Sequence, residues 1–437
     1  MNRAPVVVKG RLWRDGALVP GALGIDPTTG RITGVARDLP GDIVHDFGSK
    51  AILPGAVDIH VHFRDPGHTH KEDLTSGSTA AAFGGVTGFV DMPNTLPTTT
   101  TLRATKDKLA ACAKKCVVDY AVWAGGTWFT EELPQILKHA AGVKTYLGAS
   151  TGDLLLEDVE RFKLVLAGAA QANRPAVLHA EAQRVLNQLR RTEGTNEDHD
   201  QARPPLAEVE AIYDVMKATM GMKRPPRVHI AHVASAEALQ ATSTAKFSSG
   251  VTPHHLLLDH RAELSHAYGK VNPPLRPPAQ REALWKAFAD GKIPILESDH
   301  APHTKVEKED NYHTAPAGLP GVETMMPLMV ALAAKNKLEL RRLVDAATIA
   351  PAAILNLKDR GTLEAGMRAD FAAYDLKKPV KVSADGLHSK CGWTPFQGHS
   401  AIFPTHTFLA GKLVVEEGEL VAQPGTARSL LPPPRDG

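Results

Sequence analysis

Histidines are the residues of this chain whose number and spacing point most directly to chemistry. The chain has 20 His against 6 Tyr, and imidazole both transfers protons near neutral pH and binds metal ions. His60 and His62 end an apolar run two residues apart, and side chains at that spacing share one face of a β-strand. The pair can hold one metal ion, although two hydrogen-bonded interior histidines explain the same spacing.

Three further residues that can bind a metal ion end similar runs later in the chain, namely His179, His232 and Asp299. Imidazole and carboxylate groups suit zinc and similar ions. Each residue alone is also explained as a hydrogen-bonded core or loop residue. Together they favour a metal site, because five runs would bring such residues to one place.

Lys144 lies inside the apolar run 142–148, where a charged amine loses its hydration. One interpretation is a buried lysine paired with a carboxylate. The other is a neutral amine that has reacted with CO₂, giving a carbamate that bridges two divalent ions. With four histidines and Asp299, Lys144 completes a set for two ions that could hold a hydroxide at neutral pH.

Apolar, β-branched runs alternate with helix-like stretches through the middle of the chain, a pattern typical of a parallel sheet. Eight such units predict an α/β fold, a (β/α)₈ TIM barrel, whose functional residues stand at the carboxyl ends of the strands. The runs are residues 56–63, 86–94, 117–125, 142–148, 175–181, 227–233, 246–256 and 293–303. Runs one, four, five, six and eight carry the possible ligands.

Short strand-like segments occupy both ends of the chain, and neither end is long enough to bury a core of its own. We therefore expect a small composite β-sandwich domain built from residues 1–53 and 363–425. The barrel would span residues 54–362. The Pro-rich end, residues 426–437, predicts a mobile tail.

Composition excludes several classes of protein. With 43% hydrophobic and 22% charged residues the chain is not disordered. A formal charge of +2 gives no field for nucleic acid or a membrane surface. We expect no membrane span and no signal peptide. Three cysteines, Cys112, Cys116 and Cys391, are too few for a disulfide framework and predict buried thiols in a cytoplasmic protein.

Five motifs closely resemble those of the dihydroorotases, in the amidohydrolase superfamily. They read HVHFRDPG at 60–67, MPNT at 92–95, KVNPPLR at 270–276, DHAPH at 299–303 and GLPGVET at 318–324. The resemblance covers nearly the whole chain and is closest to members with a lysine bridge. It implies reversible cyclisation of N-carbamoyl-L-aspartate to L-dihydroorotate in pyrimidine biosynthesis.

The resemblance also implies roles for residues. One ion, zinc by preference, would be held by His60, His62 and Asp299, the other by His179 and His232, with carboxylated Lys144 between them. A hydroxide shared by the ions would attack the ring amide, and Asp299 would carry its proton to the leaving nitrogen. The implied substrate residues are Arg64, Asn94 and His303 for the carboxylate and Asn272, Ala317 and Gly318 for the ring.

Two of these residues could instead have structural roles, because Arg64 could form a surface ion pair and Asn94 could be a turn residue. The loop 148–153 is either a mobile flap over the substrate or an ordinary loop. Glu297 faces the same side as Asp299 and could support a histidine or lysine. His254 and His255 are expected to be structural.

Two other functions fit the metal residues. Another cyclic amidohydrolase, an allantoinase or hydantoinase, would keep the metals but would not need a carboxylate clamp. A non-catalytic scaffold for aspartate transcarbamoylase would typically lack the ligands that this chain has. The expected partner is a small-molecule substrate, and the resemblance leaves open a homodimer and an association with aspartate transcarbamoylase.

Overall fold

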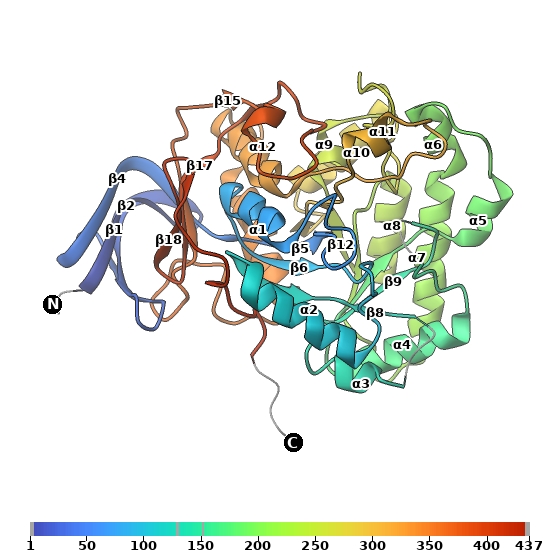
Figure 1. The fold of residues 1–437 in the computed structure, drawn as a ribbon, viewed down its shortest axis with the longest axis horizontal. Coiled ribbons are helices and arrows are strands. Elements are labelled where there is room, and N and C mark those ends of the chain that lie inside the picture. The colour runs from blue at the N-terminus through green and yellow to red at the C-terminus, as the bar shows by residue number, and fades with distance from the viewer. Residues whose placement is uncertain (1–3, 128–130, 151–152, 433–437) are drawn as a thin grey trace.

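Parallel strands surrounded by helices form one part of the molecule, and a long, mostly antiparallel sheet forms the other (Figure 1). The computed structural model describes residues 4–127, 131–150 and 153–432. The α/β class predicted from the alternating runs is confirmed.

The central strands pair in parallel with their neighbours, in a three-stranded and a six-stranded sheet. A hydrogen bond from Trp123 N to Asp91 O lies where the first sheet passes into the second, and a bridge joins Val61 to His300. The strands are β5 (Ala56–Val61), β6 (Val86–Asp91) and β7 (Asp119–Val122), then β8 (Ala124–Gly125), β9 (Val143–Tyr146), β10 (Ala176–His179), β11 (Val228–Ile230), β12 (Ser248–Val251) and β13 (Ile295–Leu296).

Helices lie between and around these strands (Figure 1), and several begin at side chains that accept backbone N–H groups, such as Asp73, Thr101 and Ser235. They are α1 (Leu74–Phe83), α2 (Leu102–Lys115), α3 (Leu133–Ile136), α4 (Val159–Gln171), α5 (Gln183–Gln188), α6 (Asn196–Ala202), α7 (Pro205–Thr219), α8 (Ala236–Ala245), α9 (Pro253–Leu257), α10 (Pro278–Ala289), α11 (Lys305–Glu309), α12 (Val322–Ala334), α13 (Leu340–Val344) and α14 (Ala350–Ile354). A π-helical turn, η1 (Asp345–Ile349), and a 3₁₀ turn, η2 (Ala384–Gly386), complete the set.

Both ends of the chain contribute to one eight-stranded sheet, in the order β19-β18-β17-β14-β4-β1-β2-β3. Strand β4 joins the two ends, because it pairs in parallel with β1 and antiparallel with β14. The strands are β1 (Ala4–Arg14), β2 (Ala17–Asp26), β3 (Arg31–Ala36), β4 (Gly41–Pro54), β14 (Phe371–Tyr374), β17 (Pro404–Leu409), β18 (Lys412–Glu416) and β19 (Glu419–Leu420). A separate ribbon pairs β15 (Val380–Lys381) with β16 (Ser400–Ala401).

The last described segment packs on the central strands rather than hanging free. Leu430 N donates to Tyr120 O at 2.8 Å, and Leu430 and Leu431 are buried in a cluster with Val57 and Val90. The prediction of a mobile tail from residue 426 therefore does not hold for residues 427–431. Two leucines among the prolines give the segment enough apolar surface to dock. Residues 433–437 of that tail lie outside the described part.

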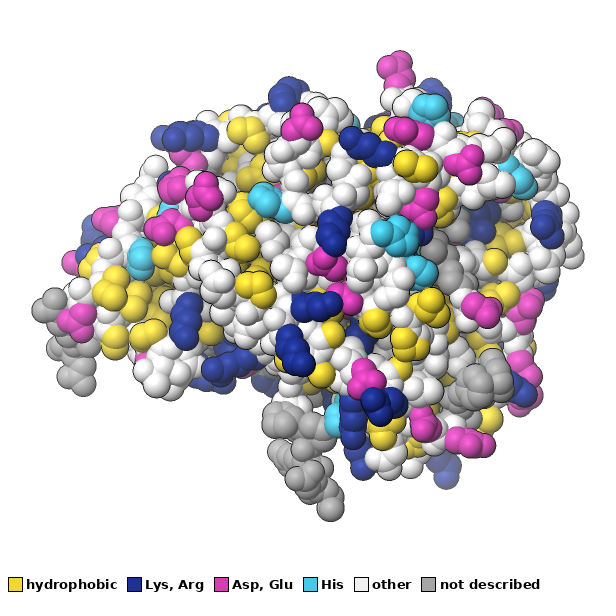
Figure 2. All heavy atoms as spheres, viewed as in Figure 1, with side chains coloured by type: hydrophobic (Ala, Val, Ile, Leu, Met, Phe, Trp, Pro, Cys, Tyr) yellow, Lys and Arg dark blue, Asp and Glu magenta, His cyan; other side chains and the backbone are white. Residues whose placement is uncertain are grey.

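The surface carries Lys and Arg interspersed with Asp and Glu over the face seen in Figure 2, and the formal net charge of the chain is +2. The three cysteines are free and buried, as expected. Among the described residues no helix combines the length and apolarity needed to cross a membrane.

Candidate active site

Two histidines at the end of β5 meet an aspartate that follows β13. His60 Nε2 and His62 Nε2 lie 3.2 and 3.3 Å from Asp299 Oδ1. All three side chains are buried. Because alternate residues of β5 share a face, both imidazoles reach the same carboxylate oxygen.

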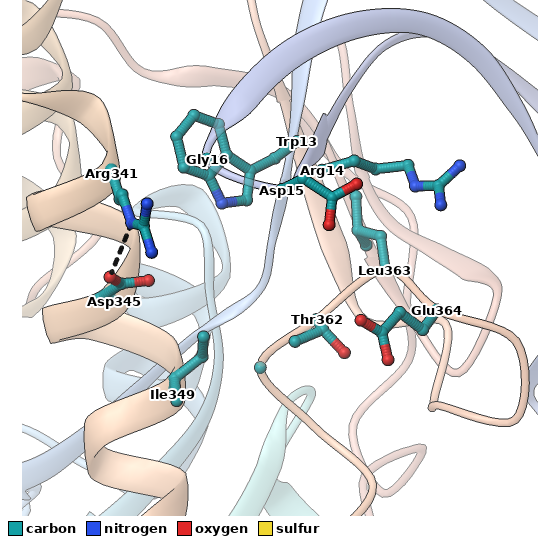
Figure 3. Close-up of a pocket in the computed structure, with 11 residues that line it drawn as sticks. Trp13, Arg14, Asp15, Gly16, Arg341, Asp345, Ile349, Thr362, Leu363 and Glu364 are labelled. Carbon is teal, nitrogen blue, oxygen red and sulfur yellow. Dashed lines mark ion pairs between the residues drawn. The ribbon is translucent and has the colours of Figure 1, made fainter.

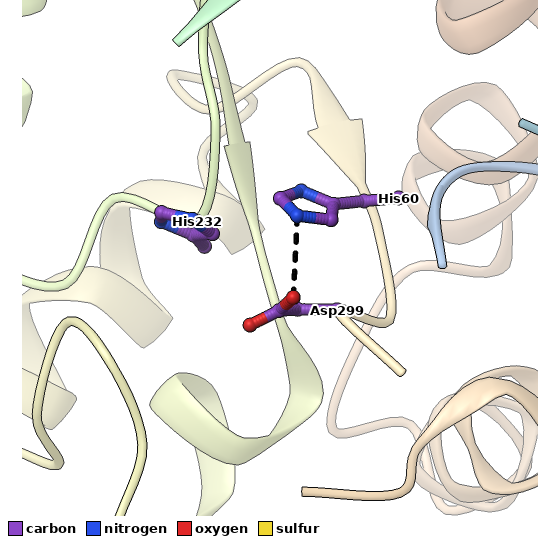
Figure 4. Close-up of side chains that lie close together, drawn as sticks. All are labelled: His60, His232 and Asp299. Atoms are coloured by element: carbon purple, nitrogen blue, oxygen red, sulfur yellow. Dashed lines mark ion pairs between the residues drawn. The ribbon is translucent and has the colours of Figure 1, made fainter. Parts of the chain in front are cut away.

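A second pair of histidines comes from β10 and the end of β11. His179 Nδ1 lies 3.2 Å from His232 Nε2, and both rings are buried. Figure 4 shows His232, His60 and Asp299 converging from three separate segments, and the possible ligand atoms of these three lie within 4.8 Å of one another. The sequence-predicted ligands thus come together from distant parts of the chain.

Lys144 lies on β9 between the two groups and is fully buried. Its Nζ lies 3.5 Å from His60 Nε2, and it forms no ion pair with any carboxylate of the described residues, so the paired-lysine interpretation finds no partner there. Burial lowers the pKa of Lys144 to about 8, against the opposing charges of Glu297 and Asp299. A neutral amine is therefore accessible near neutral pH.

Burial also governs the protonation of the other groups. Burial, helped by the charge of Lys144, lowers the pKa of His60 to about 4. Burial holds the pKa of His62 and of His232 well below the usual range, and it raises the pKa of Asp299. Neutral imidazoles keep a lone pair for a metal ion.

The spacing of these atoms suits metal ions. Two ligands about 2.1 Å from one tetrahedral ion lie roughly 3.4 Å apart. The His60–Asp299, His62–Asp299 and His179–His232 separations are 3.2, 3.3 and 3.2 Å. The residues present therefore fit divalent ions in two adjacent groups.

Glu297, whose role the sequence left open, connects the two groups. Its Oε1 accepts the backbone N–H of His232 at 2.5 Å. Its Oε2 lies 3.5 Å from His60 Nδ1 and 3.5 Å from His229 Nε2. The carboxylate thus holds the backbone of His232 and lies beside the ring of His60, so it reaches one histidine of each group, as the position two residues before Asp299 allowed.

Strained backbone marks three of the predicted site residues. Arg64, His232 and Asp299 have φ of 61°, 39° and 46°, in the left-handed region that side-chain-bearing residues rarely adopt. Such conformations gather at functional sites. At Asp299 the turn aims the carboxylate across to His60 and His62.

A cavity opens in front of the ligand groups, and five of the six predicted substrate residues line it. Its walls are formed by His60, His62, Arg64, Asn94, Tyr146, Ser150, His179, His232, Val271, Asn272, Asp299, Ala301, Ala317 and Gly318. His303 lies just behind this wall, its Nε2 3.2 Å from both Arg64 Nη2 and Ala317 O.

Arg64 and Asn94 are both buried and contact other residues of the site. Arg64 is only 2% exposed, so it is not a surface ion pair. Its Nε donates to Pro302 O. Asn94 Oδ1 accepts from His62 Nδ1 at 2.7 Å, which leaves His62 Nε2 to face Asp299. Asn94 therefore supports a predicted metal ligand while it lines the cavity.

Sequence reasoning missed Tyr146, Ser150, Val271 and Ala301 as lining residues. The signal for Tyr146 was present, because it follows Lys144 by two positions on β9 and so shares its face. Ser150 belongs to the proposed flap 148–153, of which residues 151 and 152 lie outside the described part. His254 and His255 do not line the cavity.

A second hollow lies between the β1–β2 turn and α13 (Figure 3). Its walls include Trp13, Arg14, Arg341, Asp345 and Glu364. It contains none of the predicted site residues, and its lining has no histidine or cysteine. The cavity at the strand ends is therefore the candidate active site.

Comparison with known proteins agrees with this geometry. Residues 51–414 match the model of the Amidohydrolase family. The dihydroorotase of Methanosarcina acetivorans is 35% identical, covering 96% of this chain and 94% of its own. That of Halobacterium salinarum is 37% identical, covering 92% and 96%. Among solved structures, an L-hydantoinase (dihydropyrimidinase) from Arthrobacter aurescens superposes with a TM-score of 0.90 at 27% identity, over 97% and 99% of the two chains.

Proposed function

The chain belongs to the amidohydrolase family, and we propose that within it the protein is a dihydroorotase, which interconverts N-carbamoyl-L-aspartate and L-dihydroorotate. One observation favours dihydroorotate over other cyclic amides as the substrate. A buried guanidinium, Arg64, lines the same cavity as Asp299 and the histidines. Arginine presents a planar fork of donors that matches a carboxylate, and dihydroorotate has a carboxylate that hydantoin and dihydrouracil lack.

The cofactor belongs to this proposal. We propose two divalent ions, zinc by preference, with His60, His62 and Asp299 for one and His179 and His232 for the other. A carbamate on Lys144 would bridge them. When bound, such ions supply Lewis acidity, which polarises the amide carbonyl and makes water a nucleophile near neutral pH. The buried amine of Lys144, which forms no ion pair with a carboxylate of the described residues, supports this assignment.

The protein's own residues would bind the substrate and transfer the proton. Arg64 and Asn94 bind the substrate carboxylate, with His303 behind them. Asn272 and the backbone of Ala317 and Gly318 hold the ring. In the hydrolytic direction the Asp299 carboxylate, through the oxygen not turned to His60 and His62, accepts the proton of the attacking water and gives it to the leaving ring nitrogen. Its raised pKa, caused by burial, suits a carboxylate that must hold a proton for part of the cycle.

The finer architecture is also an interpretation. We take the two parallel sheets as one closed (β/α)₈ barrel over residues 54–362, and the eight-stranded sheet as part of a composite β-sandwich. The Trp123–Asp91 hydrogen bond and the Val61–His300 bridge support closure. A homodimer, an association with aspartate transcarbamoylase and a cytoplasmic location stay predictions.

The test compares a charged and a neutral ring in the wild type and in Arg64→Met. We expect the wild type to hydrolyse dihydroorotate far better than dihydrouracil, hydantoin or allantoin. Losing one partner of a buried charge pair costs about 2–5 kcal/mol, so kcat/KM for dihydroorotate should fall at least about 30-fold in the variant. Preference of the wild type for a neutral ring would instead make it a hydantoinase or allantoinase.

A further inference from the structure

A buried histidine and a partly buried glutamate lie directly behind Asn272, outside the cavity wall. His199 Nδ1 is 2.7 Å from Glu193 Oε2. On the other side of the same ring, His199 Nε2 is 2.8 Å from Asn272 Oδ1 and 3.0 Å from the backbone oxygen of Val271. Asn272 and Val271 line the cavity, whereas Glu193 and His199 do not.

The partners of His199 determine where its protons lie. A backbone oxygen only accepts hydrogen bonds, so the contact with Val271 O requires a proton on Nε2. The short contact between Nδ1 and Glu193 needs a second proton between those two atoms. Burial opposes ionisation of Glu193, but the hydrogen bond from His199 and the charge of Lys270 lower the pKa of this carboxyl to about 2. Burial also lowers the pKa of His199, and the hydrogen bond and charge of Glu193 oppose that shift, so the doubly protonated ring depends on Glu193.

The proton on Nε2 in turn determines how the amide of Asn272 is turned. A protonated Nε2 faces an acceptor, so the atom of Asn272 that lies 2.8 Å away is the oxygen Oδ1. The NH₂ group of Asn272 then points away from His199 and into the cavity. An isolated Asn could present either end of its amide, and His199 removes that freedom.

The surrounding loops are fixed by two buried lysines. Lys270 Nζ donates to the backbone oxygens of Tyr312 and His313 and lies 3.5 Å from Glu193. Lys308 Nζ donates to the backbone oxygens of Lys270, Pro316 and Gly318 at 3.0–3.1 Å. The two segments expected to face the substrate ring are residues 270–272 and 316–318. The side chains of Lys270 and Lys308 therefore connect both segments to the surrounding backbone.

We propose that the Glu193–His199 pair is a positioning device that holds the side-chain NH₂ of Asn272 toward the cavity, so that the site selects a ring with a carbonyl oxygen at that point. The inference rests on the proposed function only for the identity of the ring. Neither His199 nor Glu193 touches the substrate, and both act through Asn272. A cyclic amide offering an N–H there would be rejected.

The test uses the metal-loaded full chain with L-dihydroorotate, in His199→Leu and His199→Gln. Leucine removes both ring nitrogens, whereas the glutamine amide can place an N–H near the position of Nε2. A misplaced binding group far from the chemistry can cost about 100-fold. We expect kcat/KM to fall about 10- to 100-fold in His199→Leu, mainly through KM, and to stay within about threefold of wild type in His199→Gln.

His388→Leu is the matched control, because His388 Nδ1 also lies 2.7 Å from a glutamate, Glu323, but outside the cavity. It should leave KM unchanged, and all variants should keep the wild-type metal content. In an Asn272→Leu background, His199→Leu should have no further effect, since the two act as one unit. Equal losses in the Leu and Gln variants, or additive losses with Asn272→Leu, would overturn the proposal.

A readout independent of turnover separates this proposal from the proposed function. Long-range ¹H–¹⁵N correlation spectra of the wild type, with the His199 signal assigned by its absence from His199→Gln, should show a proton on Nε2. An unprotonated Nε2 overturns the positioning role even if dihydroorotate is hydrolysed. If Nε2 is protonated but the chain does not hydrolyse dihydroorotate, the positioning role of His199 is supported and only the assignment of dihydroorotate as the substrate is wrong.

Discussion

Two of the four candidate ligand histidines, His62 and His179, are oriented by what their other ring nitrogen touches. His62 gives Nδ1 to Asn94, so Nε2 faces Asp299. His179 gives Nε2 to Glu181 at 2.7 Å, so Nδ1 faces His232. Partners of this kind fix the tautomer and orientation of a metal ligand. His62 and His179 therefore use different nitrogens of the imidazole ring, because an amide oxygen lies behind one ring and a carboxylate behind the other.

Asp299 is the residue on which turnover should depend most. Asp299→Asn keeps the shape and one oxygen but cannot accept a proton. We expect kcat to fall about 10²- to 10⁴-fold, the usual contribution of a positioned acid–base group. Binding of dihydroorotate, measured by calorimetry, should survive because Arg64 and Asn94 remain. Asp345→Asn, at the second hollow, is the control, and activity of Asp299→Asn near wild type would reject the role.

Among single residues, the sequence predicted those that lie within a repeated apolar pattern and missed those that lie outside it. His60, His62, Lys144, His179, His232 and Asp299 could be found because each belongs to an apolar run. Glu193 and His199 come from a loop and the short helix α6, where no strand periodicity leads to Asn272. The contact of His199 with Asn272 joins residues 73 positions apart, which spacing alone cannot reveal.

The strands themselves are shorter than the runs that predict them. The eighth run extends over residues 293–303, but only Ile295–Leu296 is strand. The left-handed backbone at Asp299 ends the extended conformation, and the rest of the run is the loop that carries Asp299 and His303. The apolar pattern continues there because the loop is buried, so periodicity could not locate the strand end.

Strand β12 should tolerate no side chain at Gly250. A Cβ there would collide with Glu297 Oε1 and come within 3.0 Å of His229 Nε2. We expect Gly250→Ala to displace Glu297 and weaken metal affinity about 10- to 100-fold, as loss of a supporting group typically does. Chelator competition measures this. Gly34→Ala on β3 is the control, since no heavy atom lies within 4 Å of its Cβ position. Unchanged affinity in Gly250→Ala would show that Glu297 does not support the ligands.

The molecule as a whole is held together by contacts between distant parts of the chain. Asp119 on β7 binds Arg360 at 2.6 Å and Arg368 at 2.8 Å, and both arginines also bind Asp370. This buried cluster joins the central strands to the strand β14 side of the eight-stranded sheet. The sequence predicted that both ends share a sheet, but the strand order depends on such non-local contacts and could not be predicted.

The docked C-terminal segment should contribute to stability. Leu430 is 6% exposed and packs at the central strands, and truncating a buried leucine costs about 2–5 kcal/mol. We expect Leu430→Ala to lower the free energy of unfolding by that amount. Val421→Ala is the control, because Val421 is 43% exposed and a surface change of this kind costs about 0.5 kcal/mol or less. Equal stability of the two variants would mean that the segment is not docked in solution.

The central claim is that six side chains from five strand ends hold divalent ions that the reaction needs. The most direct measurement is the metal content of the purified chain together with its activity on N-carbamoyl-L-aspartate, before and after Lys144→Ala. We predict about two ions per chain in the wild type, and fewer ions with loss of nearly all activity in Lys144→Ala. A Lys144→Ala chain with wild-type metal content and wild-type turnover would contradict the account.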